Sequence, residues 1–362
     1  MWDDDIKPAP GCIAAYVQAM QQHPEALGYA GPSYVPKDPA SAWACAVHLS
    51  DCLFFWDAAA DWRVAQVLPW AVTANLAVAN SPVTFDLRFP KTGGGEDIDY
   101  CLKVTGGKLL PVPQAAVHHP LWNNGRRCYS RFFGWAYGDG ALITMHPHLT
   151  YPCWPFSAEA CWLLLLLAAA AAVLQALLRV LAAVVVMVSA SAPAGSELLL
   201  SGSSWLTTSC RWTFQCGVAS VCAAVGFKAV DLMLDVARAF QPTRKAKHPT
   251  ATPLLRVLAA AEASLIKTWS ETGRLWGQLQ RRELQLNTLL RRFDWFCGLS
   301  PAVVAAEKQR GGWRFLACCA GACMSWLAAA AAATSGGVGL SAMLVAALIA
   351  GCSCGMLWRL EG

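Results

Sequence analysis

Charged residues are scarce in this sequence, and those present do not form a pattern typical of nucleic-acid binding. Only 14% of the 362 residues are charged, whereas 56% are hydrophobic. That balance is too apolar for a purely soluble protein, so membrane-embedded segments are expected. The net charge of +5 is small, the basic residues cluster between apolar runs, and no basic-aromatic motif typical of nucleic-acid binding is present. Nucleic acid is therefore not expected as a partner, whereas a lipid bilayer is.

Two other features are missing. Met1–Asp5 is acidic where a secretory signal peptide needs basic residues, so no such peptide is predicted there. No cysteine combines with a histidine at zinc-finger spacing, so structural zinc is not expected. The sixteen cysteines do not indicate a disulfide scaffold, because many lie inside apolar runs as small buried hydrophobic residues. These are Cys216, Cys222, Cys318, Cys319, Cys323, Cys352 and Cys354.

The segment with the clearest chemical content is a glycine turn followed by acidic residues. Gly93, Gly94 and Gly95 allow a tight turn and a close backbone approach, and they lead into a predicted helix with Glu96 and Asp97 in its first turn. Acidic residues at a helix start also suit the helix dipole without any catalytic role. The neighbouring segments favour the functional interpretation.

Those segments recur in a characteristic order. A β-rich run with an asparagine, Trp70–Val78, precedes the glycines, and a strand ending in His118 and His119 follows the acidic helix. This order resembles the second half of a family 2 glycosyltransferase catalytic domain. The resemblance implies a partial GT-A fold over residues 1–150, an α/β domain with a mixed sheet and flanking helices.

The resemblance also assigns roles to the acidic turn. It implies that Asp97 is the catalytic base that deprotonates an acceptor hydroxyl, and that Glu96 positions the acceptor. Gly94 and Gly95 would lie at the same acceptor site. Asp99, one turn further along the helix, is expected to point elsewhere.

An acidic run at the N-terminus completes the resemblance. Taken alone, Asp3–Asp5 is typical of a solvated tail. In the resembled family an Asp-x-Asp motif precedes a proline-rich turn and a helix, which implies that Asp3 and Asp5 bind Mg²⁺ or Mn²⁺ against the diphosphate of a nucleotide sugar. Asp4 and Asp5 are the alternative frame. His118 is a candidate third ligand, with His119 the weaker one.

In that family a βαβ nucleotide-binding half precedes the Asp-x-Asp motif. The resemblance therefore implies that the chain is truncated at its N-terminus. A catalytically inactive, transferase-like membrane protein acting as a subunit or scaffold is the corresponding alternative.

Two aromatic segments have alternative interpretations. Arg127 and Arg131 are interleaved with aromatic residues and would bind the donor diphosphate. The Gln-x-x-Arg-Trp motif of processive family members is absent, and a basic amphipathic helix on the membrane surface is the alternative. A second group of aromatic residues either stacks on a sugar or, as the helical spacing favours, packs in a core. These are Phe54, Phe55, Trp56 and Trp62.

The remainder of the sequence predicts an all-α multi-pass membrane region with four spans. Two spans fall within residues 151–240, at Cys161–Val188 and Trp212–Val230, and residues 313–362 form a hairpin of two more, Trp313–Ala333 and Val338–Trp358. The loop 241–312 is rich in Arg and Lys, which places it and the catalytic domain in the cytosol.

The basic loop has apolar residues at helical spacing with Arg and Glu between them. It predicts amphipathic helices in the membrane interface, with Gly273 and Gly277 as possible breaks and a coiled-coil helix as the rival. Arg291–Phe296 resembles an interface anchor.

Together these features predict a membrane-bound inverting glycosyltransferase of hexosyltransferase type. It would transfer a sugar from a nucleotide-diphosphate sugar to a hydroxyl on a glycan or a lipid-linked acceptor. A transporter using Lys228, Asp231 and Asp235 as intramembrane charges is disfavoured by the small number of spans.

Overall fold

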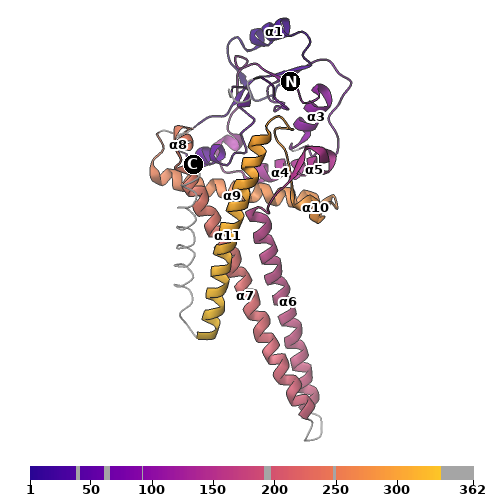
Figure 1. Cartoon of the computed structure of the whole chain (residues 1–362), viewed down its shortest axis with the longest axis vertical. Helices are drawn as coiled ribbons and strands as arrows, with labels where there is room; N and C mark the ends of the chain where they lie inside the picture. The colour runs from indigo at the N-terminus through magenta and orange to yellow at the C-terminus, as the bar shows by residue number, and fades with distance from the viewer. Residues whose placement is uncertain (38–40, 61–65, 92, 191–196, 248–249, 336–362) are drawn as a thin grey trace. The chain divides into compact units, whose positions relative to one another are not determined.

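The structure, a computed structural model, describes the chain except residues 38–40, 61–65, 92, 191–196, 248–249 and 336–362 (Figure 1). It divides into two compact units. The first unit combines residues 1–155 with residues 235–312, and the second combines residues 156–234 with residues from 313 onward. The basic loop therefore belongs to the same unit as the N-terminal region.

The first unit contains two small mixed sheets, as the sequence predicts. Their strands are β1 (Lys7–Pro8), β2 (Gly28–Ala30), β3 (Ser33–Tyr34), β4 (Leu76–Val78), β5 (Leu110–Pro111) and β6 (Val117–His118). One sheet has the order β1-β6-β3 and the other β4-β2-β5. In each sheet the central strand has one antiparallel and one parallel neighbour.

The first unit also contains short helices and one long helix. They are α1 (Cys12–Gln22), α2 (Ala42–Leu49), α3 (Glu96–Thr105), α4 (Tyr129–Asp139), α5 (Leu142–Met145), α8 (Pro242–Lys247), α9 (Pro253–Gln280) and α10 (Leu286–Leu289). The long helix, α9, begins at Thr252, whose hydroxyl accepts a hydrogen bond from the Leu255 amide at 3.2 Å, with Pro253 as its first residue.

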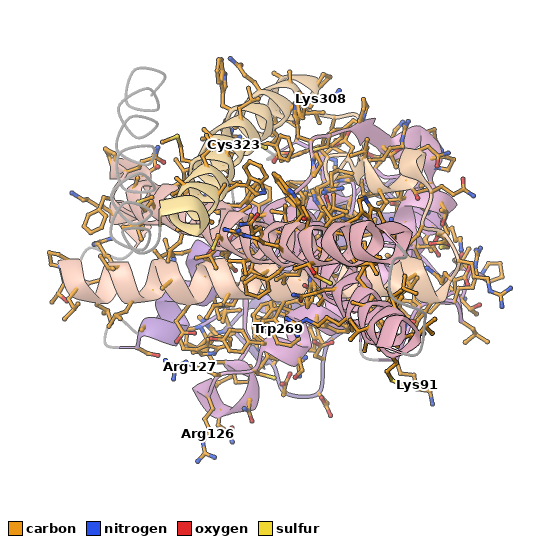
Figure 2. The ribbon with its side chains drawn as sticks, turned by 90° about the horizontal axis from the view of Figure 1, so that it is seen from below. Lys91, Arg126, Arg127, Trp269, Lys308 and Cys323 are labelled. Carbon is orange, nitrogen blue, oxygen red and sulfur yellow. The ribbon has the colours of Figure 1, made fainter. Side chains whose placement is uncertain are left out.

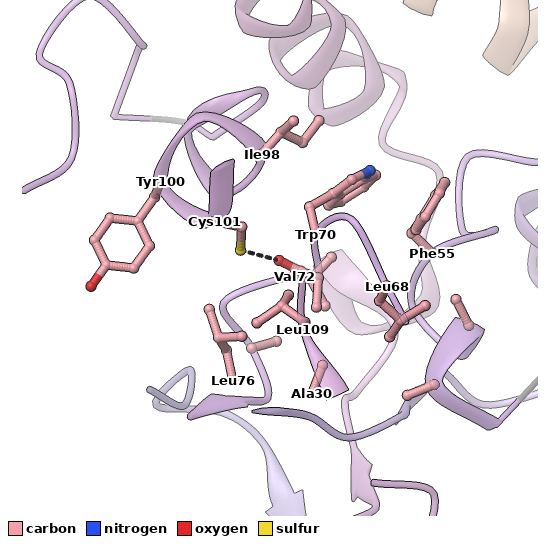
Figure 3. Packing of buried hydrophobic residues seen from close by; sticks show 14 of the residues in the cluster. Ala30, Phe55, Leu68, Trp70, Val72, Leu76, Ile98, Tyr100, Cys101 and Leu109 are labelled. Carbon is pink, nitrogen blue, oxygen red and sulfur yellow. Dashed lines mark hydrogen bonds between the residues drawn. The ribbon is translucent and has the colours of Figure 1, made fainter. Parts of the chain in front are cut away.

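A buried cluster of apolar side chains holds the β4-β2-β5 sheet against α3 (Figure 3). Leu76, Leu109 and Ile98 are at most 2% exposed. Phe55 is also in this cluster, with its ring stacked on Trp70 at 4.2 Å. Phe55 therefore packs in the core, the interpretation that the sequence favoured.

The aromatic segment after α2 does not continue as an α-helix, although its residues have helical spacing. The helix α2 ends at Leu49, and Asp51 has a φ of 64°, which a continuing α-helix cannot contain. The chain then turns through a short 3₁₀ segment, Ala58–Ala60. Trp62 lies outside the described residues.

Gly273 and Gly277 do not break α9, contrary to the sequence prediction. The helix runs through both positions and brings its backbone against α4. A Cβ atom at Gly273 would lie 2.1 Å from the Phe133 carbonyl oxygen, and one at Gly277 would lie 2.5 Å from that of Tyr137. The two glycines therefore serve close helix packing, which sequence spacing alone does not distinguish from helix interruption.

The predicted interface anchor is also wrong. Residues Arg291–Phe293 form strand β8, which pairs antiparallel with β7 (Thr150–Pro152). Phe293 and Phe296 are 4% and 7% exposed and belong to the same buried cluster as Trp70. This segment therefore stabilises the first unit by core packing.

The second unit is helical. The helices α6 (Ser157–Ala190), α7 (Glu197–Ala239) and α11 (Pro301–Ser335) are long and apolar enough to span a membrane over residues 157–188, 205–239 and 301–331. The first two ranges contain the first two predicted spans, and the third covers Trp313–Ala333 except for its last two residues. The fourth, Val338–Trp358, lies outside the described residues.

Close packing and ion pairs join the helices of the second unit. A Cβ atom at Gly226 on α7 would lie 2.1 Å from the Ser325 hydroxyl oxygen on α11. Asp231 is 3% exposed and accepts hydrogen bonds from Lys228 at 2.9 Å and from Arg314 at 2.7 Å. Because these charges are paired with one another, they stabilise helix contacts, and nothing about them favours the transporter interpretation.

Candidate functional site

Three potential metal ligands meet at the edge of the β1-β6-β3 sheet. The ligand atoms of Asp3, Asp5 and His119 all lie within 4.8 Å of one another. His119 Nε2 is 3.3 Å from Asp5 Oδ1 and 3.9 Å from Asp3 Oδ2. The antiparallel pairing of β1 with β6 brings these distant segments together, because Lys7 is opposite His118.

The histidine of this triad is His119, whereas the sequence analysis preferred His118. Successive side chains of a strand point to opposite sides, so a shift of one residue changes which histidine faces the aspartates. His118 is exposed, and its ring lies 5.9 Å from that of Tyr34. His119 is 2% exposed, and its amide donates to the Tyr34 carbonyl at 2.9 Å.

The hydrogen bonding of His119 prepares it to bind a cation. Its Nδ1 lies 2.6 Å from the Pro120 carbonyl oxygen. A carbonyl can only accept, so Nδ1 carries the hydrogen, and the lone pair of the neutral ring is on Nε2. That lone pair faces the two aspartates. Negative charge and a lone pair converge there, an arrangement that a metal ion or a proton stabilises.

The acidic turn reaches the site through close contact with α4. Gly93, Gly94 and Gly95 have φ values of 90°, 107° and 85°, a region that favours glycine. A Cβ atom at Gly94 would lie 1.9 Å from the Trp135 carbonyl oxygen. The glycines therefore pack the start of α3 against α4, and a role for Gly94 and Gly95 in acceptor binding stays a prediction.

The Asp97 carboxylate is half-buried and accepts hydrogen bonds from one residue, Thr73. The amide and hydroxyl of Thr73 donate to its carboxylate oxygens at 3.3 and 2.9 Å. Burial, followed by the negative charge of Glu96, nevertheless raises the pKa of Asp97 to about 7. A carboxyl that changes protonation state near neutral pH is suited to act as a general base.

Glu96 and Asp3 connect this acidic pair to the metal triad. Burial is the main influence that raises the pKa of Glu96, and the Asp3 carboxylate raises the pKa of both Glu96 and Asp97 further. Glu96 Oε2 is buried without a hydrogen-bond partner among the described residues. Burial also raises the pKa of Asp3, while His119 and Arg131 lower it. The charge of Asp3 thus links the acidic pair electrostatically to the triad.

Trp56, Trp122 and Trp135 form an aromatic wall beside His119 and Arg131. The rings of Trp56 and Trp122 lie 5.0 and 5.1 Å from that of His119. The guanidinium of Arg131 lies over Trp122 at 5.6 Å and over Trp135 at 6.0 Å. The sequence analysis gave Trp122 no role, since no spacing rule relates it to the aspartates. Trp56, considered there for sugar stacking, lines this wall.

The two predicted phosphate-binding arginines have different surroundings. The positive charge of Arg131 lowers the pKa of Asp3. Arg127 instead donates from Nε to Glu262 of α9 at 2.6 Å, and the Tyr129 hydroxyl donates to the same carboxylate. Arg127 thus fastens α4 to α9, and its predicted role in diphosphate binding has no support from this geometry.

Asp99 points away from the site, as predicted. It is 1% exposed, accepts from Lys103 at 2.6 Å and lies 3.0 Å from His146 Nε2. Its carboxylate is thereby committed to contacts with a lysine and a histidine. Of the acidic residues of α3, only Glu96 and Asp97 contribute to the candidate site.

Comparisons with protein families, with curated proteins and with solved structures found no match. The functional assignment therefore rests on the site. Its donor set of two carboxylates and one imidazole suits a divalent cation, and the imidazole favours Mn²⁺ over Mg²⁺.

Proposed function

We propose that the protein is a membrane-bound inverting glycosyltransferase that uses a nucleotide-diphosphate sugar. The observation that supports the proposal best is the convergence of a metal-ligand triad, Asp3, Asp5 and His119, with the acidic pair Glu96 and Asp97. Sugar transfer of this type needs both parts. One neutralises a leaving diphosphate, and the other activates a hydroxyl.

The proposed chemistry divides between the two parts of the site. Asp97, held by Thr73, takes the proton of the acceptor hydroxyl, while Glu96 accepts a hydrogen bond from the acceptor. The acceptor oxygen forms a bond to the anomeric carbon as the bond to the diphosphate oxygen breaks on the opposite face. A divalent cation on Asp3, Asp5 and His119 would supply positive charge to the departing diphosphate.

Arg131 adds a fixed positive charge to this site. Its guanidinium lies over the faces of Trp122 and Trp135, which limits its motion, and it lies near Asp3. A planar guanidinium binds phosphate through two parallel hydrogen bonds. We therefore assign donor-diphosphate binding to Arg131.

The proposed orientation places the first unit on the cytosolic side. Residues 1–155 and the loop 240–300 belong to one compact unit, so we expect them on the same side of a membrane. The intervening helices α6 and α7 then cross as a pair, which agrees with a cytosolic basic loop under the positive-inside rule. Cytosolic nucleotide sugar would reach the site directly.

The test is release of nucleoside diphosphate by the full chain in lipid vesicles, with Mn²⁺ and a panel of sugar nucleotides. Asp97→Asn should lower the rate by roughly 100-fold or more, because a general base contributes at least that much. Asp86→Asn is the matched control, since Asp86 forms an ion pair with Arg88 at 2.7 Å on the surface of the same unit. Full activity in Asp97→Asn would refute the base assignment.

A further inference from the structure

The helix α9 has an apolar face that the first unit leaves uncovered. Six large apolar side chains of α9 are 45–69% exposed: Leu254, Leu258, Leu265, Trp269, Trp276 and Leu279. With 3.6 residues per turn, these positions fall within an arc of roughly 80° on one side of the helix. Trp269, labelled in Figure 2, is one of them. A continuous apolar stripe of this length is unusual for a surface in contact with water.

Three polar residues on the side of α9 opposite this stripe are buried in the protein. Arg256 and Arg274 are each 6% exposed, and Gln278 is 0% exposed. Lys267, on the same side as these residues, donates to Asp235 at 2.9 Å, and Glu262, at the border of the stripe, accepts hydrogen bonds from Arg127 and Tyr129. This distribution is the reverse of that of a soluble amphipathic helix, which exposes its charges and buries its apolar residues.

The inner face of α9 is already occupied by protein. Gly273 and Gly277 contact the α4 backbone, and Ala260 and Ala263 are at most 2% exposed in a cluster with residues of α2. The outer apolar face therefore does not complete the core of the first unit, and its cover must come from outside that unit.

The position of α9 along the chain identifies a bilayer as that cover. The helix lies between two helices that are long and apolar enough to span a membrane, α7 ending at Ala239 and α11 beginning at Pro301. Short connections, residues 240–252 and 281–300, join it to both. The first of them includes the basic helix α8, which suits anionic headgroups. Tryptophan and leucine on one face are typical of helices in the interface.

We propose that the outer face of α9 is a lipid-docking surface, immersed in the interfacial layer of a bilayer that contains anionic lipid. The opposite side of α9 then holds the site away from the lipid. On α4, Phe133 and Tyr137 face α9, while Trp135 contacts the glycine turn of the acidic site. The wall of the site is thus separated from the bilayer by one helix diameter, about 10 Å. This consequence for the site rests on the proposed function.

The test is photocrosslinking of the full chain in vesicles of phosphatidylcholine and phosphatidylglycerol. The crosslinker p-benzoylphenylalanine replaces Trp269 in one variant and Trp276 in another. Val17 on α1, which is 47% exposed and apolar, is the matched control position, and Leu177 on α6, 63% exposed on a predicted span, is the positive control.

After irradiation, mass spectrometry should detect lipid adducts at positions 269, 276 and 177, with at least tenfold less adduct at position 17. Crosslinks from 269 or 276 to a second copy of the chain would overturn the proposal and identify an oligomer interface. Equal lipid labelling at position 17, or none at 269 and 276 while 177 is labelled, would also overturn it. Because the readout is the mass of the adduct, it is independent of sugar transfer, and an inactive protein would not affect the result.

Discussion

Replacing His119 with glutamine should weaken the binding of Mn²⁺, whereas the same change at His118 should not. The ligand atoms of Asp3, Asp5 and His119 lie within 4.8 Å of one another, while His118 is exposed on the other side of β6. The change removes the imidazole lone pair that Nε2 directs at the two aspartates.

The expected magnitude follows from how the site is built. Even residues that only support a metal ligand typically contribute 10- to 100-fold to affinity, so loss of a direct ligand should cost at least about 10-fold, or about 1.4 kcal/mol. Asp3→Asn should also weaken Mn²⁺ binding, because it removes one carboxylate ligand. Burial and the charge of Asp5 raise the pKa of Asp3, so a cation would stabilise the charged form of this carboxyl.

Isothermal titration of Mn²⁺ into the detergent-solubilised full chain measures these affinities directly. Thermal unfolding at rising Mn²⁺ concentration provides a second measurement, since a ligand present at 100 times its dissociation constant adds about 2.7 kcal/mol of stability. Equal Mn²⁺ affinities for His119→Gln, His118→Gln and the unmodified chain would refute the assignment of a metal site to this triad.

Three more predictions concern the acidic turn. The kcat/KM of sugar transfer should rise about tenfold per pH unit below about pH 7 and level off above it, because Asp97 must lose its proton to act as a base. A pH profile that is flat between 5.5 and 8.5 would contradict this role. Asp97→Asn should stabilise the fold at pH 8 relative to the unmodified chain, measured by thermal unfolding. The folded state binds the Asp97 proton more tightly than the unfolded state, so the stability of the unmodified chain falls as pH rises from about 4 to about 7. If the substitution changed stability equally at pH 4 and pH 8, this linkage would be disproved. Gly94→Ala should lower the unfolding temperature more than Gly106→Ala. Both positions have positive φ, which costs roughly 1–2 kcal/mol for alanine, but only at Gly94 would the new Cβ atom also collide with Trp135. If both substitutions lowered the unfolding temperature equally, the contact between Gly94 and Trp135 would be unimportant for stability.

Several features could be predicted from local sequence. The long apolar runs predicted α6 and the membrane parts of α7 and α11, because a helix that spans lipid must be apolar over its whole length. The glycine turn and its acidic helix were placed correctly, since positive φ at Gly93–Gly95 and a helix from Glu96 depend on neighbouring residues.

The errors arose where contacts between distant segments decide the outcome. Gly273 and Gly277 were interpreted as helix breaks because glycine has low helix propensity, yet their contacts with α4 override that propensity. Arg291–Phe296 has the composition of a membrane anchor, but pairing of β8 with β7 places Phe293 in a protein core. Local composition alone cannot distinguish these environments.

The sequence by itself determined the helices apolar and long enough to span a membrane, the acidic turn and the types of residue available for metal binding. Tertiary structure decided which of them meet. The register of β1 against β6 sets His119 beside Asp3 and Asp5, and close packing on α4 brings the acidic turn and Arg131 toward the same place. The same packing turned the charges of α9 inward and its apolar residues outward. Hydrophobic spacing shows that a helix has two faces, but only the neighbouring elements determine which face is buried.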